Sequence, residues 1–251
     1  MNIPLELLIH TFLVFLRALA LLLSMPLFSW KMVPVQVRLG LALGLAITVA
    51  PVIPTAVVPS DAAGLAMAAT HALVFGFAMG MTMRIIFATL ELAGHFIAVE
   101  MGLAMPIGMD PLQSKQSTAA AQWLNTLAMI IFFTGGFHHL ALEAFVKSFA
   151  LQPNGQTVYF LVSFDWIAAA SSAMFQIGFA MAAPIVAVNF LVNLSFAVLG
   201  KVTPRMNVFI TSFPVRIMGG FAILAGSVGL LTEFIVEILN RSVDSALIAF
   251  Q

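Results

Sequence analysis

Three side chains that could carry chemistry, Arg84, Glu91 and His95, share one face of a long apolar segment. On an α-helix, seven residues return a side chain to within about 20° of its starting direction, and four more turn it by about 40°. Charges inside a membrane are costly and face a bundle interior or a wet cavity. Two interpretations stay open: a proton relay, or structural charge pairs with a neighbouring chain, which we favour. Arg17, another charge within an apolar run, is grouped with these residues as a structural charge partner.

The other chemistry-bearing residues form no catalytic pattern. His138 and His139 are adjacent, so on a helix they point about 100° apart and cannot share one metal ion. The sequence has no G-x-S-x-G, P-loop or dinucleotide-binding motif, and it has no cysteine. Ten basic residues balance ten acidic ones, which leaves no electrostatic footprint for nucleic acid. We therefore expect no enzymatic activity, no cofactor, no metal and no nucleic-acid partner.

The stretch 101–118 reads MGLAMPIGMDPLQSKQST and joins two apolar segments. Its two glycines and two prolines interrupt helical character. At membrane depth, a non-helical backbone is tolerated only where protein buries it or where it lines a cavity. Methionine side chains are unbranched and adaptable, which suits a deformable seal. A surface loop between two helices is the alternative interpretation of this stretch.

The composition indicates that most of the surface does not face water. Hydrophobic residues make up 62% of the 251 residues, and the mean hydropathy is +1.09. Charged residues make up 8%, against about 25% in ordinary soluble domains. So few charges cannot cover a chain of 26.9 kDa. The composition therefore argues against a soluble enzyme, a disordered chain and a coiled coil, and it indicates that lipid or other apolar protein covers most of the surface.

Uncharged runs locate the elements that position these residues. They include 22 residues at 62–83, 27 at 116–142 and 35 at 166–200. Long runs without alternation predict helices and exclude a barrel, whose strands need about 10 alternating residues. A helix over 166–200 would be about 52 Å long, beyond the bilayer core of about 30 Å. Either Pro184 kinks it, or part of it packs against protein outside the lipid. We expect an all-α, polytopic membrane-type protein with long, kinked helices over residues 5–28, 35–51, 63–90 (with a continuation to 99), 119–149, 166–200 and 208–239.

The basic residues do not reveal a membrane orientation. They are spread one or two to a connection, whereas a polytopic carrier concentrates Lys and Arg in alternate loops. We interpret this as a sign that the helices pair mainly with other subunits. The glycine pairs Gly40/Gly44 and Gly76/Gly80 allow helix backbones to approach closely, within the chain or between subunits.

Fragments along nearly the whole chain resemble the FliR family, the R subunit of the flagellar type III export gate, which is related to virulence-type secretion proteins. Each fragment is unspecific alone, but their shared order and spacing extend over about 230 residues. The matching features are Arg17 followed by Pro26, PVQVRLGLAL at 34–43, ELAGHFI at 91–97, MGL at 101–103 with Asp110-Pro111, Pro184 with Asn189 and Asn193, and PRMNVFI at 204–210 with Phe213-Pro214.

The resemblance implies one export-gate domain over residues 1–251 that looks like a fusion of two other gate subunits. About 1–160 would be P-like, and about 161–251 would be a Q-like helical hairpin. The implied partners are the P and Q subunits (FliP and FliQ), an FlhB-type switch protein, unfolded flagellar proteins and membrane lipid. The implied location is the bacterial inner membrane, at the flagellar basal body.

The resemblance also places the family's plug loop within the stretch 101–118, where glycine and proline interrupt the helix, without deciding which residues face the lumen. The residues carried over are Met105, Pro106, Ile107, Gly108, Met109, Asp110 and Pro111. We expect a structural, channel-forming gate subunit that passes unfolded flagellar proteins, is unstable alone and catalyses nothing. The same role in a virulence injectisome is one alternative. A proton-coupled small-molecule carrier that uses Arg84, Glu91 and His95 is another.

Overall fold

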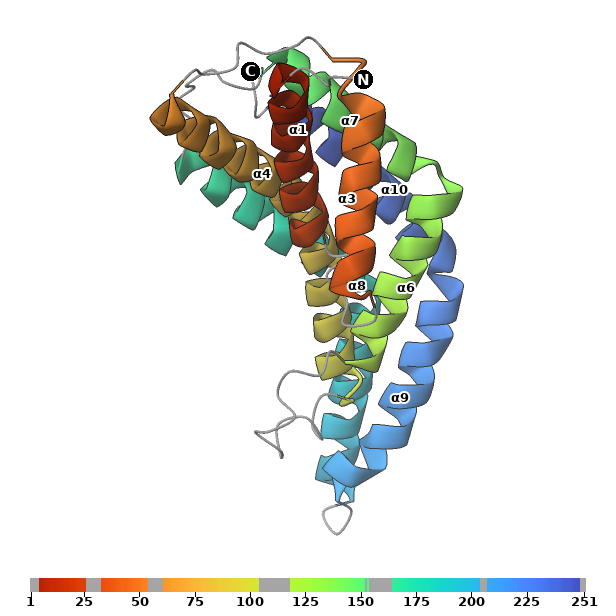
Figure 1. Cartoon of the computed structure of the whole chain (residues 1–251). Helices are drawn as coiled ribbons and strands as arrows, with labels where there is room; N and C mark the ends of the chain where they lie inside the picture. The colour runs from red at the N-terminus through yellow and green to blue at the C-terminus, as the bar shows by residue number, and fades with distance from the viewer. Residues whose placement is uncertain are drawn as a thin grey trace. The chain divides into compact units, whose positions relative to one another are not determined.

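The computed structural model describes residues 5–25, 33–53, 61–103, 118–151, 153, 164–203 and 207–248. Most of these residues are helical and no strand occurs among them, which confirms the predicted all-α class. The helices are α1 (Leu5–Ser24), α3 (Val35–Val49), α4 (Ala62–Glu100), α6 (Ala119–Thr134), α7 (Phe137–Leu151), α8 (Phe164–Val202), α9 (Val208–Gly226) and α10 (Val228–Ile248) (Figure 1).

Three of these helices are long and apolar enough to cross a membrane. They are α1, α4 and the part of α8 from Ala168 to Val202. The pairs α6–α7 and α9–α10 pass the same test when each pair counts as one broken span, which gives up to five spans in the described residues. The polytopic membrane character predicted from the uncharged runs is therefore confirmed.

Both of the longest predicted helices are continuous, and each has 39 residues. The helix α4 runs from Ala62 to Glu100, so the predicted continuation beyond residue 90 is confirmed. The helix α8 keeps Pro184 in its interior. The helix α1 ends at Ser24, and residues 26–28 of its predicted span lie outside the described residues.

Two predicted helices are wrong because each is two helices. The predicted helix over 119–149 breaks at Gly135 and Gly136, and Gly136 has a φ of +75°, in the left-handed region that ends helices. The predicted helix over 208–239 breaks at Ser227, where α9 and α10 meet at 61°. The Ser227 N–H donates to the carbonyls of Ile223 and Leu224, which closes the last turn of α9.

The chain forms two compact units, each made of several chain segments. The first unit comprises residues 1–86, 133–168 and 239–251, and the second comprises 87–132 and 169–238. The division near residue 160 into P-like and Q-like parts concerns resemblance to other subunits and stays a prediction.

In the first unit, α4 packs closely against α1 through two glycines. A Cβ at Gly76 would lie 3.0 Å from the Cβ of Ala20, and a Cβ at Gly80 would lie 2.7 Å from the carbonyl oxygen of Leu21. This pair therefore packs within the chain. In contrast, a Cβ at Gly40 or Gly44 of α3 would meet nothing within 4 Å.

In the second unit, small residues again set the helix contacts. A Cβ at Gly94 of α4 would lie 2.5 Å from the Ala121 nitrogen of α6. A Cβ at Gly178 of α8 would lie 3.3 Å from the Thr89 carbonyl oxygen of α4. A neighbouring edge-to-face pair, Phe96 and Phe179, also joins α4 to α8, with 5.9 Å between ring centroids. These contacts hold α4, α6 and α8 together around the features described next.

Candidate functional site

A cavity of about 340 Å³, open to the surface of this chain, lies between α4, α6 and α8 in the second unit. Two of the predicted charge partners, Glu91 and His95, line it from α4. The helix spacing predicted that these two side chains share a face, and the cavity brings them together. The rest of the wall is Ala88, Leu92, Thr118, Ala121 and Met174.

The wall of this cavity is fixed by the contact between α4 and α6. Gly94, beside His95 in the sequence, lies so close to Ala121 that a side chain there would collide with backbone atoms. The Thr118 hydroxyl donates to the Gly94 carbonyl, 3.4 Å away, and accepts from the Ala121 N–H at 3.3 Å. The hydroxyl is therefore engaged by these contacts, which leaves Glu91 and His95 as the polar side chains available to something entering the cavity.

Glu91 and His95 are both exposed in this chain. Within the described part of the chain, neither has a hydrogen-bond or ion-pair partner, whereas Glu143 and Lys147 of α7 form an ion pair at 2.7 Å. Arg84, on the part of α4 in the first unit, is also exposed and does not line the cavity. The charge-partner role of these residues stays a prediction.

Arg17 has a different setting, in the interior of the first unit. Its side chain is fully buried, at 0% exposure, and its guanidinium carbon lies 4.9 Å from the ring centre of Phe75 and 4.2 Å from that of Phe149. Arg17 also donates from Nη1 to the carbonyl oxygen and the hydroxyl of Ser148, both at 3.3 Å. The π faces of aromatic rings attract cations, so both rings favour the charged form.

The contact with Ser148 makes Arg17 a cap for a neighbouring helix. The last four carbonyls of a helix have no partner within it, and Ser148 supplies one of these four in α7, which ends at Leu151. A cation at this end is also attracted by the partial negative charge at the C-terminus of the helix. Two helical turns earlier on α1, the His10 Nε2 lies 3.2 Å from the carbonyl oxygen of Ala50, the C-cap of α3. The helix α1 therefore holds the ends of two neighbouring helices through two buried side chains.

The first residues of the stretch 101–118 end the helix α4. The Leu103 N–H donates to the Ala98 carbonyl at 2.8 Å, and the Gly102 N–H donates to the Val99 carbonyl at 3.0 Å. Gly102 has a φ of +75°. This pair of bonds around a left-handed glycine is the Schellman motif, which ends α4.

Met101, beside this stop, is buried and packs on α9. Its side-chain atoms occupy the space in which Gly220 would carry a Cβ, and the ring of Phe213 lies against Gly102 in the same way. The plug residues predicted from the resemblance, Met105 to Pro111, lie outside the described residues. Their role as a constriction stays a prediction.

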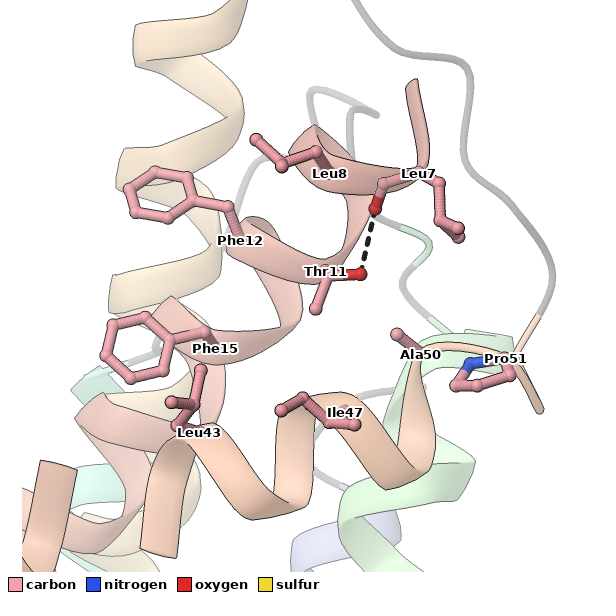
Figure 2. Close-up of a pocket in the computed structure, with 9 residues that line it drawn as sticks. All are labelled: Leu7, Leu8, Thr11, Phe12, Phe15, Leu43, Ile47, Ala50 and Pro51. Carbon is pink, nitrogen blue, oxygen red and sulfur yellow. Dashed lines mark hydrogen bonds between the residues drawn. The ribbon is translucent and has the colours of Figure 1, made fainter. Parts of the chain in front are cut away.

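An apolar groove in the first unit was not anticipated from the sequence. It has a volume of about 580 Å³ and lies between α1 and α3. Figure 2 shows its lining, with Leu8, Phe12 and Phe15 from α1 and Leu43 and Ile47 from α3. The Thr11 hydroxyl donates to the Leu7 carbonyl at 2.8 Å, so it is already bonded. This groove can hold apolar groups but offers no group for acid–base chemistry.

The rings of the two adjacent histidines, His138 and His139, lie with their centroids 4.1 Å apart and their planes tilted by 39°. His138 also lies 5.6 Å from the ring of Phe133. Among the residues that the structure describes, no group of three His, Cys, Asp or Glu side chains could hold a metal ion.

Comparison with known proteins assigns the chain to one family. The model of the family described as bacterial export proteins, family 1, matches residues 8–242. The chain is 29% identical over 226 residues to the flagellar biosynthetic protein FliR of Escherichia coli (strain K12), which covers 90% of this chain and 87% of that protein. It is 30% identical over 254 residues to FliR of Bacillus subtilis (strain 168), with 98% and 96% covered. With FliR of Caulobacter vibrioides, the identity is 28% over 215 residues, with 85% and 86% covered.

Proposed function

This chain belongs to the bacterial export proteins of family 1, and from this membership we propose its role. It acts as a subunit of the flagellar protein export apparatus in the bacterial inner membrane. The observation that carries this proposal is the extent of the match. The family model covers both compact units, and the relatives named FliR match along most of their own length. Three helices long and apolar enough to cross a membrane support the location.

We propose further that the chain forms part of the export channel together with P and Q subunits (FliP and FliQ), and that an FlhB-type switch protein joins them. The support is the uncovered apolar surface. In the most apolar window of α8, only 17% of the residues are buried within the chain, against 50% in α1. Unfolded flagellar proteins would be the cargo, and the chain would act through its shape and contacts rather than by catalysis.

Within this channel, we propose that Met105–Pro111 forms the plug that keeps the gate shut. Two prolines within seven residues disfavour a helix, because Pro costs about 3 kcal/mol in a helix interior. Met105, Ile107 and Met109 are too apolar to favour water. A place inside a protein-lined channel suits both properties, because an apolar constriction blocks ions by staying dry.

The plug proposal is tested by deleting residues 105–108 and measuring both assembly and leakage. We expect the complex to assemble and the membrane to leak ions or small solutes, seen as conductance across bilayers. An assembled deletion complex as tight as the parent would place the seal elsewhere and reduce this stretch to a connector.

The export role is tested by deleting the gene that encodes the chain in its host. We expect loss of motility and of secreted flagellar proteins, both restored by the parent gene. If motility persists while secretion of virulence proteins stops, the chain serves an injectisome instead. If both persist and uptake of a small solute is lost, a proton-coupled carrier replaces the export role.

A further inference from the structure

The wall of the cavity between α4, α6 and α8 includes the carboxylate of Glu91, and no Lys or Arg among the described residues lines it. Glu91 is exposed on a 39-residue apolar helix, with no partner among the described residues. Carboxylates within membrane segments are rare and pair with another group. Thr118 is already bonded to α4 and α6, so the carboxylate and the His95 ring are the polar groups that remain.

We propose that this cavity receives a single Lys or Arg side chain from a membrane helix of a companion subunit, with Glu91 as its counter-ion. The proposal rests on the proposed function, because the companion is another membrane subunit of the export gate. The present proposal specifies where one contact between the subunits lies and that opposite charges form it.

The size and lining of the cavity fit one long basic side chain. The cavity is open to the surface and has a volume of about 340 Å³, so a long side chain from a neighbouring helix can enter it. Lys and Arg lay their aliphatic stems along apolar surfaces while the charged head meets a polar group. Ala88, Leu92, Ala121 and Met174 supply the apolar walls, and Glu91 and His95 supply the polar end.

The surface around the cavity fits the helix that would carry such a side chain. On α8, Phe175 and Phe179 directly follow the wall residue Met174 and the close contact at Gly178 in the sequence, and they are 56% and 53% exposed. On α4, Val99 lies one turn beyond His95 and is 52% exposed. An acidic centre with an apolar surround is complementary to an apolar helix with one basic residue, as in helix-in-groove recognition.

The first test measures how much of the companion subunits co-purifies with the tagged chain from membranes. Removing one partner of a desolvated charge pair costs several kcal/mol, so Glu91→Gln should lower recovery by about tenfold or more. The matched control is Glu143→Gln, which removes an acid whose carboxylate and Lys147 partner are half exposed. The control should recover the same amount as the parent. A Glu91→Gln complex recovered at the parent's level would overturn the proposal.

The second test identifies the occupant directly. A photoreactive benzoylphenylalanine at position 88, on the wall of the cavity, should cross-link to a companion subunit. Glu91→Lys should abolish assembly, and restored assembly should require a Lys or Arg to acid change in a membrane helix of that subunit. An adduct with phospholipid alone would overturn the proposal in favour of a lipid site.

Two further outcomes would also overturn the proposal. If Lys115→Gln reproduces the loss seen with Glu91→Gln, the chain itself supplies the cation from the stretch before Thr118. If Glu91→Gln assembles normally but stops proton-driven export, Glu91 belongs to a proton relay. The parent chain should restore motility to the deletion strain in every case, so failure here is separable from failure of the export role.

Discussion

Arg17 in the first unit and Glu91 in the second each place a charge on a long apolar helix, and their surroundings are opposite. Arg17 is fully buried between two phenylalanine rings and caps the end of α7. Glu91 is exposed beside a cavity, and no described residue contacts its carboxylate as a partner. The first charge is used inside the chain, and the second is available to another one.

This difference separates folding of the subunit from its assembly. A charge that joins helices within one chain is needed before any partner arrives, because it holds those helices together. A charge at an open cavity contributes only when a partner brings the opposite charge. Changes at Arg17 should therefore act on the chain whether or not companions are present, and changes at Glu91 should act on the complex alone.

The largest effect is expected for Arg17→Ala. The change leaves the Ser148 carbonyl unbonded, which costs about 1–3 kcal/mol, and it opens a space between Phe75 and Phe149. The amount of the chain in membranes should fall severalfold, both with and without companion subunits, as measured by immunoblot during a chase. Lys147→Ala, beside Ser148 on the exposed side of α7, is the control and should change little. Normal amounts of an Arg17→Ala chain would show that this cation does not hold α1 to α7.

A smaller loss is expected for Gly94→Ala, because the added Cβ would lie 2.8 Å from the Cβ of Ala121 and nearer still to its backbone. Overpacking of this kind costs about 1–3 kcal/mol. Separation of α4 from α6 would also deform the cavity at Glu91, so co-purification of companions should fall further than the amount of chain. Gly44→Ala is the control for the chain alone, because its Cβ would meet nothing within 4 Å. Equal behaviour of the two variants would contradict the close packing described for Gly94.

A loss of about 1 kcal/mol is expected for His10→Leu, which removes the donor to the Ala50 carbonyl and keeps the apolar bulk. Thermal aggregation of the purified complex should begin a few degrees lower. Thr11→Val is the neighbouring control, since its hydroxyl bonds only within its own helix turn. A complex with His10→Leu that is as heat-stable as the control would remove α1 from its proposed role at the end of α3.

The smallest effect is expected for Glu91→Gln in the chain expressed without companions. No described residue is a partner of the Glu91 carboxylate, so its loss breaks no contact within the chain, and the lone variant should decay in membranes no faster than the parent. The same variant should lose companions when they are co-expressed. Faster decay of the lone Glu91→Gln chain would place the residue with Arg17, as a group used inside the subunit.

Much of the fold could be predicted because it depends on long uncharged segments. The continuous α4 and α8 follow from runs of residues that lipid or protein must cover. The breaks inside two predicted helices could not be predicted in the same way. A glycine pair such as Gly135–Gly136 serves equally for close helix packing or for a left-handed turn, and only the backbone distinguishes them.

The candidate site was predictable to the extent that it lies on one helix. Glu91 and His95 are four residues apart, and helix geometry alone places them on one side of α4. The partners of Arg17 are of another kind, because Ser148 lies 131 positions away in the sequence. The cavity wall likewise combines α4 with α6 and α8, which no local pattern brings together.

The central claim is that the exposed apolar surface of this chain is covered, and its Glu91 carboxylate is paired, only in a complex with companion membrane subunits. It is tested most directly by expressing the chain with and without P and Q subunits and purifying it in mild detergent. We predict a stable complex with the companions, and a chain that aggregates or is degraded without them. A monodisperse, folded monomer obtained without companions would contradict the claim.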